Sequence, residues 1–133
     1  MITKGGGRVS GVGKTKGEKQ MKEIKAIIHP HMAHKVVHAL RELEHFPGFT
    51  LLDARGQGRG RGAKGAYIVT EDDIDYHRKT IMVIVCADER VPTITETIRK
   101  AAQTGHKGDG IITVRNLEEV IRIRSGEKND LAV

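Results

Sequence analysis

Apolar residues along the chain follow the two periods of regular secondary structure. Apolar, β-branched runs at residues 22–28, 49–54 and 80–86 predict strands. Apolar residues three or four positions apart predict one helix that begins at Pro30 and a second that begins near Pro92. The helical positions are Met32, Val36, Leu40 and Leu43 in the first helix, and Ile94, Ile98, Ala101 and Ala102 in the second. Residues 111–114 and 120–124 supply the last predicted strands.

The order of these elements is βαββαβ, with a long polar segment at residues 55–75 between the second and third strands. This order predicts an α+β, ferredoxin-like sandwich in which two helices cover one face of an antiparallel sheet. Residues 80–86 are apolar on both sides of the strand, so the other face also needs a cover. Oligomerisation is the simplest way to provide one.

A glycine-rich turn followed by two arginines predicts an anion site. Gly105, Gly108 and Gly110 permit positive φ and a close approach of backbone amides to a phosphate. Arg122 and Arg124 lie two residues apart, so they would project from one face of a strand. Alternatively, the glycines only shape a turn, and the arginines form ion pairs with nearby acidic residues: Glu118, Glu119 or Glu127.

Four segments in order carry a resemblance to a known family. They are K-E-I-K-A-I-I-H-P at residues 22–30, R-G-Q-G-R-G-R-G at 55–62, T-G-H-K-G-D-G at 104–110 and R-I-R-S-G-E at 122–127. They resemble the first strand, the base of the T-loop, the B-loop and the C-loop of the PII nitrogen signal-transduction proteins. The resemblance spans residues 21–133, which we expect to form one PII-like domain.

The resemblance implies a homotrimer that binds ATP or ADP, with or without Mg, in clefts between subunits. It also implies that the T-loop, residues 55–75, docks onto a target protein such as a membrane transporter or an enzyme. Lys79 lies at the position of a family lysine that contacts 2-oxoglutarate, and is a candidate anion contact. The implied nucleotide contacts are Thr50, Gly56, Gly58, Arg59, Val85, Gly108, Asp109, Gly110, Arg122 and Arg124.

The chain departs from the family pattern at four positions. Ile111 replaces a phosphate-binding lysine, Gly60 replaces a glutamine that helps to hold Mg-ATP and 2-oxoglutarate, and Val83 replaces an acidic residue of the adenine pocket. Asp72 stands where many bacterial members carry a tyrosine that is uridylylated. These differences predict a divergent, PII-like regulator with altered nucleotide binding.

Charge and composition limit the kinds of partner that the domain is expected to bind. The net charge is +6, but five basic residues against Glu18 give residues 1–20 a charge of +4, which leaves +2 for residues 21–133. With no Trp and four other aromatic residues, the domain offers little for specific nucleic-acid binding. We expect residues 1–20, with six glycines, to be a disordered extension or a cloning remnant. The single Cys86 and the absence of a secretory pattern predict a cytoplasmic protein.

Histidines support a second hypothesis from another class. His31, His34 and His38 would share one face of the first helix, and imidazoles at that spacing can bind Zn, Cu or Ni. The protein would then be a metal-binding trimer of the same fold that acts in metal homeostasis. A solvated polar face explains the same pattern, because no Cys or acidic ligand completes a set. No nucleophile, base and orienting group can be assembled from the sequence, so we expect no enzyme.

Overall fold

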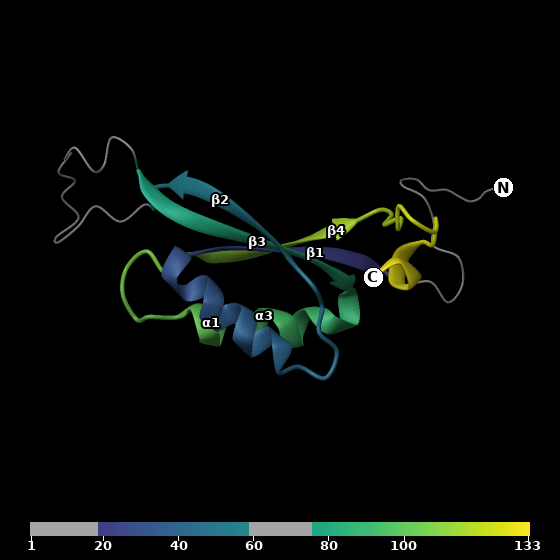
Figure 1. Ribbon diagram of the computed structural model, residues 1–133, viewed down its shortest axis with the longest axis horizontal. Helices are drawn as coiled ribbons and strands as arrows, with labels where there is room; N and C mark the ends of the chain where they lie inside the picture. The colour runs from purple at the N-terminus through teal and green to yellow at the C-terminus, as the bar shows by residue number, and fades with distance from the viewer. Residues whose placement is uncertain (1–18, 59–75) are drawn as a thin grey trace.

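The computed structural model describes residues 19–58 and 76–133 (Figure 1). Its strands are β1 (Met21–Ile28), β2 (Thr50–Gly56), β3 (His77–Ala87) and β4 (Ile111–Leu117). Its helices are α1 (Pro30–Arg41) and α3 (Val91–Ala102), with short 3₁₀ helices η2 (Asp88–Arg90) and η3 (Asn129–Ala132). Among the described helices, none combines the length and apolarity needed to cross a membrane.

The four strands form one antiparallel sheet in the order β2-β3-β1-β4. Figure 1 shows α1 and α3 side by side on one face of this sheet. The predicted ferredoxin-like α+β architecture is therefore confirmed, and so are both helices, the first three strands and the strand at residues 111–114. A proline in the first turn starts each helix, as expected for a residue whose missing N–H is not needed there.

The core lies between the helices and the sheet. Alternate residues of the two central strands, β1 and β3, point towards the helices. The helices contribute buried apolar residues spaced three or four positions apart. The burial of these aliphatic side chains fixes the register of the sheet, because a slip of one residue would turn them outward. The cluster includes Ile24, Ala26, Ile28, Val36, Leu40, Met82, Ile84, Cys86, Ile94 and Ile98.

No described helix covers the opposite face of the sheet (Figure 1). The side chains there belong to the residues between the core positions, and those of Ile27, Ile81, Val83 and Val85 are only half-buried in one chain. A sheet face with such a central aliphatic group needs a further layer. The expectation of oligomerisation therefore fits the geometry and remains a prediction.

The prediction of a strand at residues 120–124 is wrong. This segment leaves the sheet and forms a turn, with a single β-bridge between Ile121 and Lys128. The amide of Gly126 donates to the carbonyl of Arg122 (2.7 Å), and Gly126 adopts a φ of 76°. Glycine at this position lets the chain reverse before a strand can extend.

The described part of the N-terminal segment is attached to the domain. Lys19 forms an ion pair with Glu89, and the Gln20 side chain donates to the carbonyl of Leu117 (3.2 Å). The amide of Asp88 donates to the carbonyl of Gln20 (2.9 Å). Lys19 and Gln20 thus belong with the fold, and residues 1–18 of the predicted extension lie outside the described residues.

Candidate functional site

Asp109 organises the glycine turn between α3 and β4. Its carboxylate accepts hydrogen bonds from the amides of Thr104 (2.9 Å) and Gly105 (3.0 Å), and from the Thr104 hydroxyl. The hydroxyl contact is the main reason why the pKa of Asp109 lies below its usual range, and the two amides add to it. Asp109 therefore stays ionised and holds the loop in one shape.

Gly110 can be no other residue in this fold. Its φ is 107°, and a Cβ atom at this position would lie 1.7 Å from the carbonyl oxygen of Ile27. The backbone of the turn thus presses directly against the end of β1. At Gly108, with a φ of 85°, a Cβ would lie 3.3 Å from Cε1 of His29.

Two basic side chains stand beside the turn. The Lys79 ammonium donates to the carbonyl of Gly108 (3.0 Å), and Nε2 of His29 lies 3.5 Å from Oδ1 of Asp109. Burial lowers the pKa of His29, and the positive charge of Lys79 lowers it further. Lys79 also lines a pocket of about 290 Å³ with Arg55 and Arg78. This end of the sheet therefore gathers positive charge.

The second basic pair lies in the C-terminal turn. Nη1 of Arg122 lies 3.0 Å from Oε1 of Glu127, and its Nε donates to the carbonyl of Ala132 (3.3 Å). Arg124 is exposed and makes no ion pair with any described residue. The alternative drawn from the sequence, an ion pair with a nearby glutamate, thus holds for Arg122. Arg124 keeps its guanidinium open to an anion.

The glycine turn and the two arginines lie at opposite ends of the chain's sheet. β4 begins beside the end of β1 (Ile27 with Ile111) and ends beside its start (Met21 with Leu117). The seven residues of β4 span roughly 20 Å. Figure 1 shows the loop after α3 at one end and the C-terminal segment at the other. One chain therefore does not bring these two parts of the predicted site together.

The remaining predicted contacts lie at both ends of the sheet and near its middle. Gly56, at the end of β2, pairs with His77, so Gly56 and Gly58 lie at the end that holds the glycine turn. Thr50, at the start of β2, pairs with Val83, which lies opposite Lys25 near the middle of the sheet. Val85 lines a pocket of about 560 Å³ together with Asp130 and Val133 of the C-terminal segment. Arg59 lies outside the described residues, as do Gly60 and Asp72.

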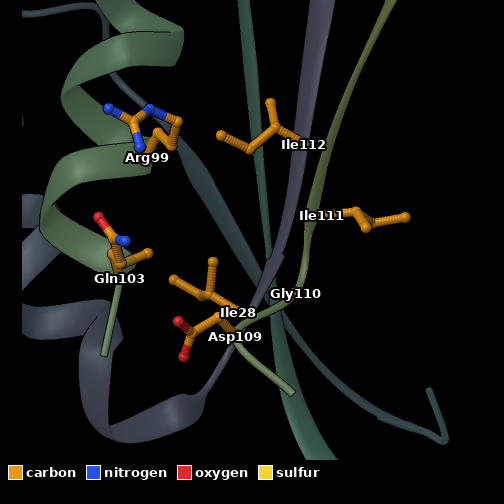
Figure 2. Close-up of a pocket in the computed structure, with 8 residues that line it drawn as sticks. Ile28, Arg99, Gln103, Asp109, Gly110, Ile111 and Ile112 are labelled. Carbon is orange, nitrogen blue, oxygen red and sulfur yellow. The ribbon is translucent and has the colours of Figure 1, made fainter. Parts of the chain in front are cut away.

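A further pocket of about 310 Å³ lies behind the turn, between α3 and the edge of the sheet (Figure 2). Arg99 of α3 and Gln103, which directly follows α3, line it, whereas the Ile111 side chain is directed away from α3. Its floor is apolar, with Ile28 and Ala102, and Arg99 is already bound to Glu96 through two hydrogen bonds. This pocket therefore offers little free charge to an anion.

Comparison with known proteins decides the family. The family model described as "Nitrogen regulatory protein P-II" matches residues 21–127. The chain belongs to the P-II family. A Nitrogen regulatory protein P-II of Rhizobium meliloti is 46% identical over 107 residues, which cover 80% of this chain and 95% of the relative. Nitrogen regulatory protein P-II 2 of Methanothermobacter thermautotrophicus is 45% identical over 113 residues, covering 85% and 97%.

Comparison with a solved structure also supports the P-II fold. The crystal structure of Arabidopsis thaliana PII bound to citrate matches with a TM-score of 0.69 and 30% sequence identity. The match covers 86% of this chain and 94% of that one. The resemblance drawn from the sequence is therefore confirmed, and the protein is a P-II family nitrogen regulatory signal-transduction protein.

The sequence analysis did not identify His29, which lies beside the glycine turn. Its approach to Asp109 and Gly108 follows from the register of the sheet, because Ile27 pairs with Ile111 and the end of β1 therefore lies beside the turn that precedes β4. The only signal in the sequence is its position directly before Pro30, at the cap of α1. That position shows where α1 begins but not which loop lies beside it.

The three histidines of the metal hypothesis do not come together as a ligand set within the described residues of one chain. His31, His34 and His38 are exposed on α1, as expected for one face, but no described group of three His, Cys, Asp or Glu residues could hold a metal ion. His31 and His38 are seven residues apart, about 10 Å along a helix axis. That distance is too long for both to reach one ion at about 2 Å.

Proposed function

We propose that this P-II protein binds ATP or ADP in clefts between subunits and thereby controls a target protein. Each cleft combines one half from each of two copies. The first half is the glycine turn with Lys79 and the base of the T-loop. The second half is the C-terminal turn with Arg122 and Arg124, next to Val85. The single observation that carries this proposal is that the two halves lie at opposite ends of one chain.

Two halves at opposite ends of one chain fit a head-to-tail arrangement of copies. A head-to-tail contact between identical chains is heterologous, and it closes into a ring when the rotation between copies allows. A homotrimer is such a ring, and it would also cover the half-buried side chains of Ile81, Val83 and Val85 on the open sheet face. The proposed oligomer thus accounts for both the divided site and the uncovered face.

The chemistry of the two halves fits a polyphosphate. Backbone amides of a glycine turn can surround phosphate oxygens without a Cβ in the way. Lys79 uses one of its three donors on Gly108, which leaves two for a ligand. Arg124 adds an open guanidinium, whose planar fork suits phosphate oxygens. Lys79 from one chain, with Arg122 and Arg124 from the other, would offset the loss of the family lysine at Ile111.

Binding would act on the T-loop, residues 55–75, through its base. Gly56 and Gly58 stand at the end of β2 that also holds the glycine turn. A nucleotide at the turn would therefore favour one set of loop conformations, a shift of population that a target protein can read. We propose a membrane transporter or an enzyme as the target, a cytoplasmic location, and regulation rather than catalysis as the protein's role.

Isothermal titration calorimetry tests the proposal. We expect ATP or ADP to bind the purified protein with a micromolar dissociation constant, about −8 kcal/mol. AMP should bind more weakly because it lacks the outer phosphates. Titrations with Mg and 2-oxoglutarate would show which ligands remain after the changes at Gly60, Val83 and Ile111. No heat from any nucleotide, for protein with a native circular dichroism spectrum, would refute nucleotide binding.

A further inference from the structure

His29 lies beside both the glycine turn and Lys79. Its Nε2 lies 3.5 Å from the Asp109 carboxylate, and its ring would touch a Cβ placed on Gly108. Lys79 approaches the same point from β3, since its Nζ would lie 3.6 Å from that Cβ. The imidazole and the ammonium thus lie directly against Gly108, at the edge of the glycine turn.

The charged and titratable groups that face His29 among the described residues come from three elements. Lys79 lies on β3, Asp109 lies on the turn, and His31 of α1 stacks on the ring with centroids 5.2 Å apart. Asp109 is bound by Thr104 and Gly105, which offset its negative charge. The imidazole is only partly buried, with 22% of its side chain exposed, so a ligand can reach it.

We propose that His29 is a proton-dependent contact for a phosphate group bound by the backbone of the glycine turn. Without a ligand the ring is neutral, and with a ligand it takes up a proton and forms a charge-assisted hydrogen bond to a phosphate oxygen. The site therefore gains a second cation beside Lys79 only when an anion is present. This inference rests on the proposed function, because it assumes that a phosphate group enters the turn.

The direction of the pH dependence follows from the neighbours of His29. Burial and the charges of Lys79 and His31 lower the pKa of the free ring, against the opposing effect of Asp109, and this shift favours the neutral form. A bound phosphate adds negative charge within contact distance and raises that pKa. Binding then takes up a proton at pH values between the two pKa values. Affinity must rise as the pH falls through this range, by linkage.

The experiment is calorimetry of ATP binding at pH 6, 7 and 8, in buffers that differ in ionisation enthalpy. The dependence of the heat on the buffer gives the number of protons taken up. For the wild type we expect uptake of up to one proton more than for the His29→Gln variant. The difference between the two proteins removes the contribution from protonation of ATP itself. We also expect about tenfold tighter binding at pH 6 than at pH 8, relative to the variant.

His34→Gln is the matched control, since His34 is an exposed imidazole on the same helix. It should behave as the wild type. Inorganic phosphate serves as a second probe: His29-dependent proton uptake with phosphate alone would assign the contact to a free anion, whereas uptake only with ATP assigns it to the nucleotide.

Equal proton uptake by wild type and His29→Gln, with ATP bound to both, would overturn the role of His29 and leave the proposed function intact. A wild type that binds neither ATP nor phosphate would overturn both. The thermal unfolding midpoint of each variant shows whether a loss of binding comes from a loss of fold.

Discussion

Replacement of Gly110 by alanine is expected to destabilise the protein by about 4 kcal/mol or more, at the upper end of single-residue effects. The added Cβ would lie 1.7 Å from the Ile27 carbonyl oxygen, which is part of the ladder between β1 and β4. Neither atom can move without separating the turn from the sheet. Urea unfolding followed by circular dichroism measures the change in the free energy of unfolding.

Gly105→Ala is the matched control for this prediction. Gly105 lies in the same loop with a φ of 86°, but nothing lies within 4 Å of a Cβ placed there. The substitution should cost only the strain of a left-handed alanine, about 1–2 kcal/mol. Similar losses for the two variants would mean that backbone strain alone, and not the contact with Ile27, requires glycine at position 110.

The second large effect is expected at the C-terminal turn. Arg122→Ala combined with Arg124→Ala should weaken ATP binding about 100-fold or more, since each hydrogen bond to a charged group contributes about 1.5–3 kcal/mol. Arg124→Ala alone should weaken binding about tenfold or more without a change in unfolding free energy, because Arg124 makes no ion pair with any described residue. Calorimetry and urea unfolding of each variant measure both quantities.

Arg122 has a structural role as well. Its side chain holds Glu127 (3.0 Å) and the carbonyl of Ala132 (3.3 Å), so its loss should also loosen the C-terminal turn. Arg41→Ala, an exposed arginine in the last turn of α1, is the control for a general loss of positive charge. Unchanged ATP affinity in the double variant would show that the C-terminal turn is not part of the site.

The elements of the fold could be predicted because burial acts on each of them separately. The period of Ile24, Ile28, Met82 and Ile84 identifies strands that pack one face on a core, and prolines show where the helices begin. The same reasoning predicts a strand at residues 120–124, and that prediction is wrong. They alternate apolar and basic residues as a strand does, but they form only one bridge, between Ile121 and Lys128, and Gly126 reverses the chain.

The site was only partly predictable, because it depends on contacts between distant segments. The glycines at 108 and 110 can be identified from their spacing and from the family resemblance. The division of the site between two ends of the chain does not appear in the sequence, since it depends on the direction and length of β4. The position of His29 beside Asp109 also depends on tertiary packing, across 80 residues of sequence.

A subunit-mixing experiment tests the central claim, that each cleft takes one half from each of two copies. Lys79→Glu damages the half at the glycine turn, and Arg122→Ala with Arg124→Ala damages the other. Each variant alone should bind little ATP. Equal co-expression of the two variants should restore wild-type affinity in about a quarter of the clefts, the chance that two intact halves meet in a ring. No recovery in mixed oligomers, verified by two affinity tags, would contradict the divided site.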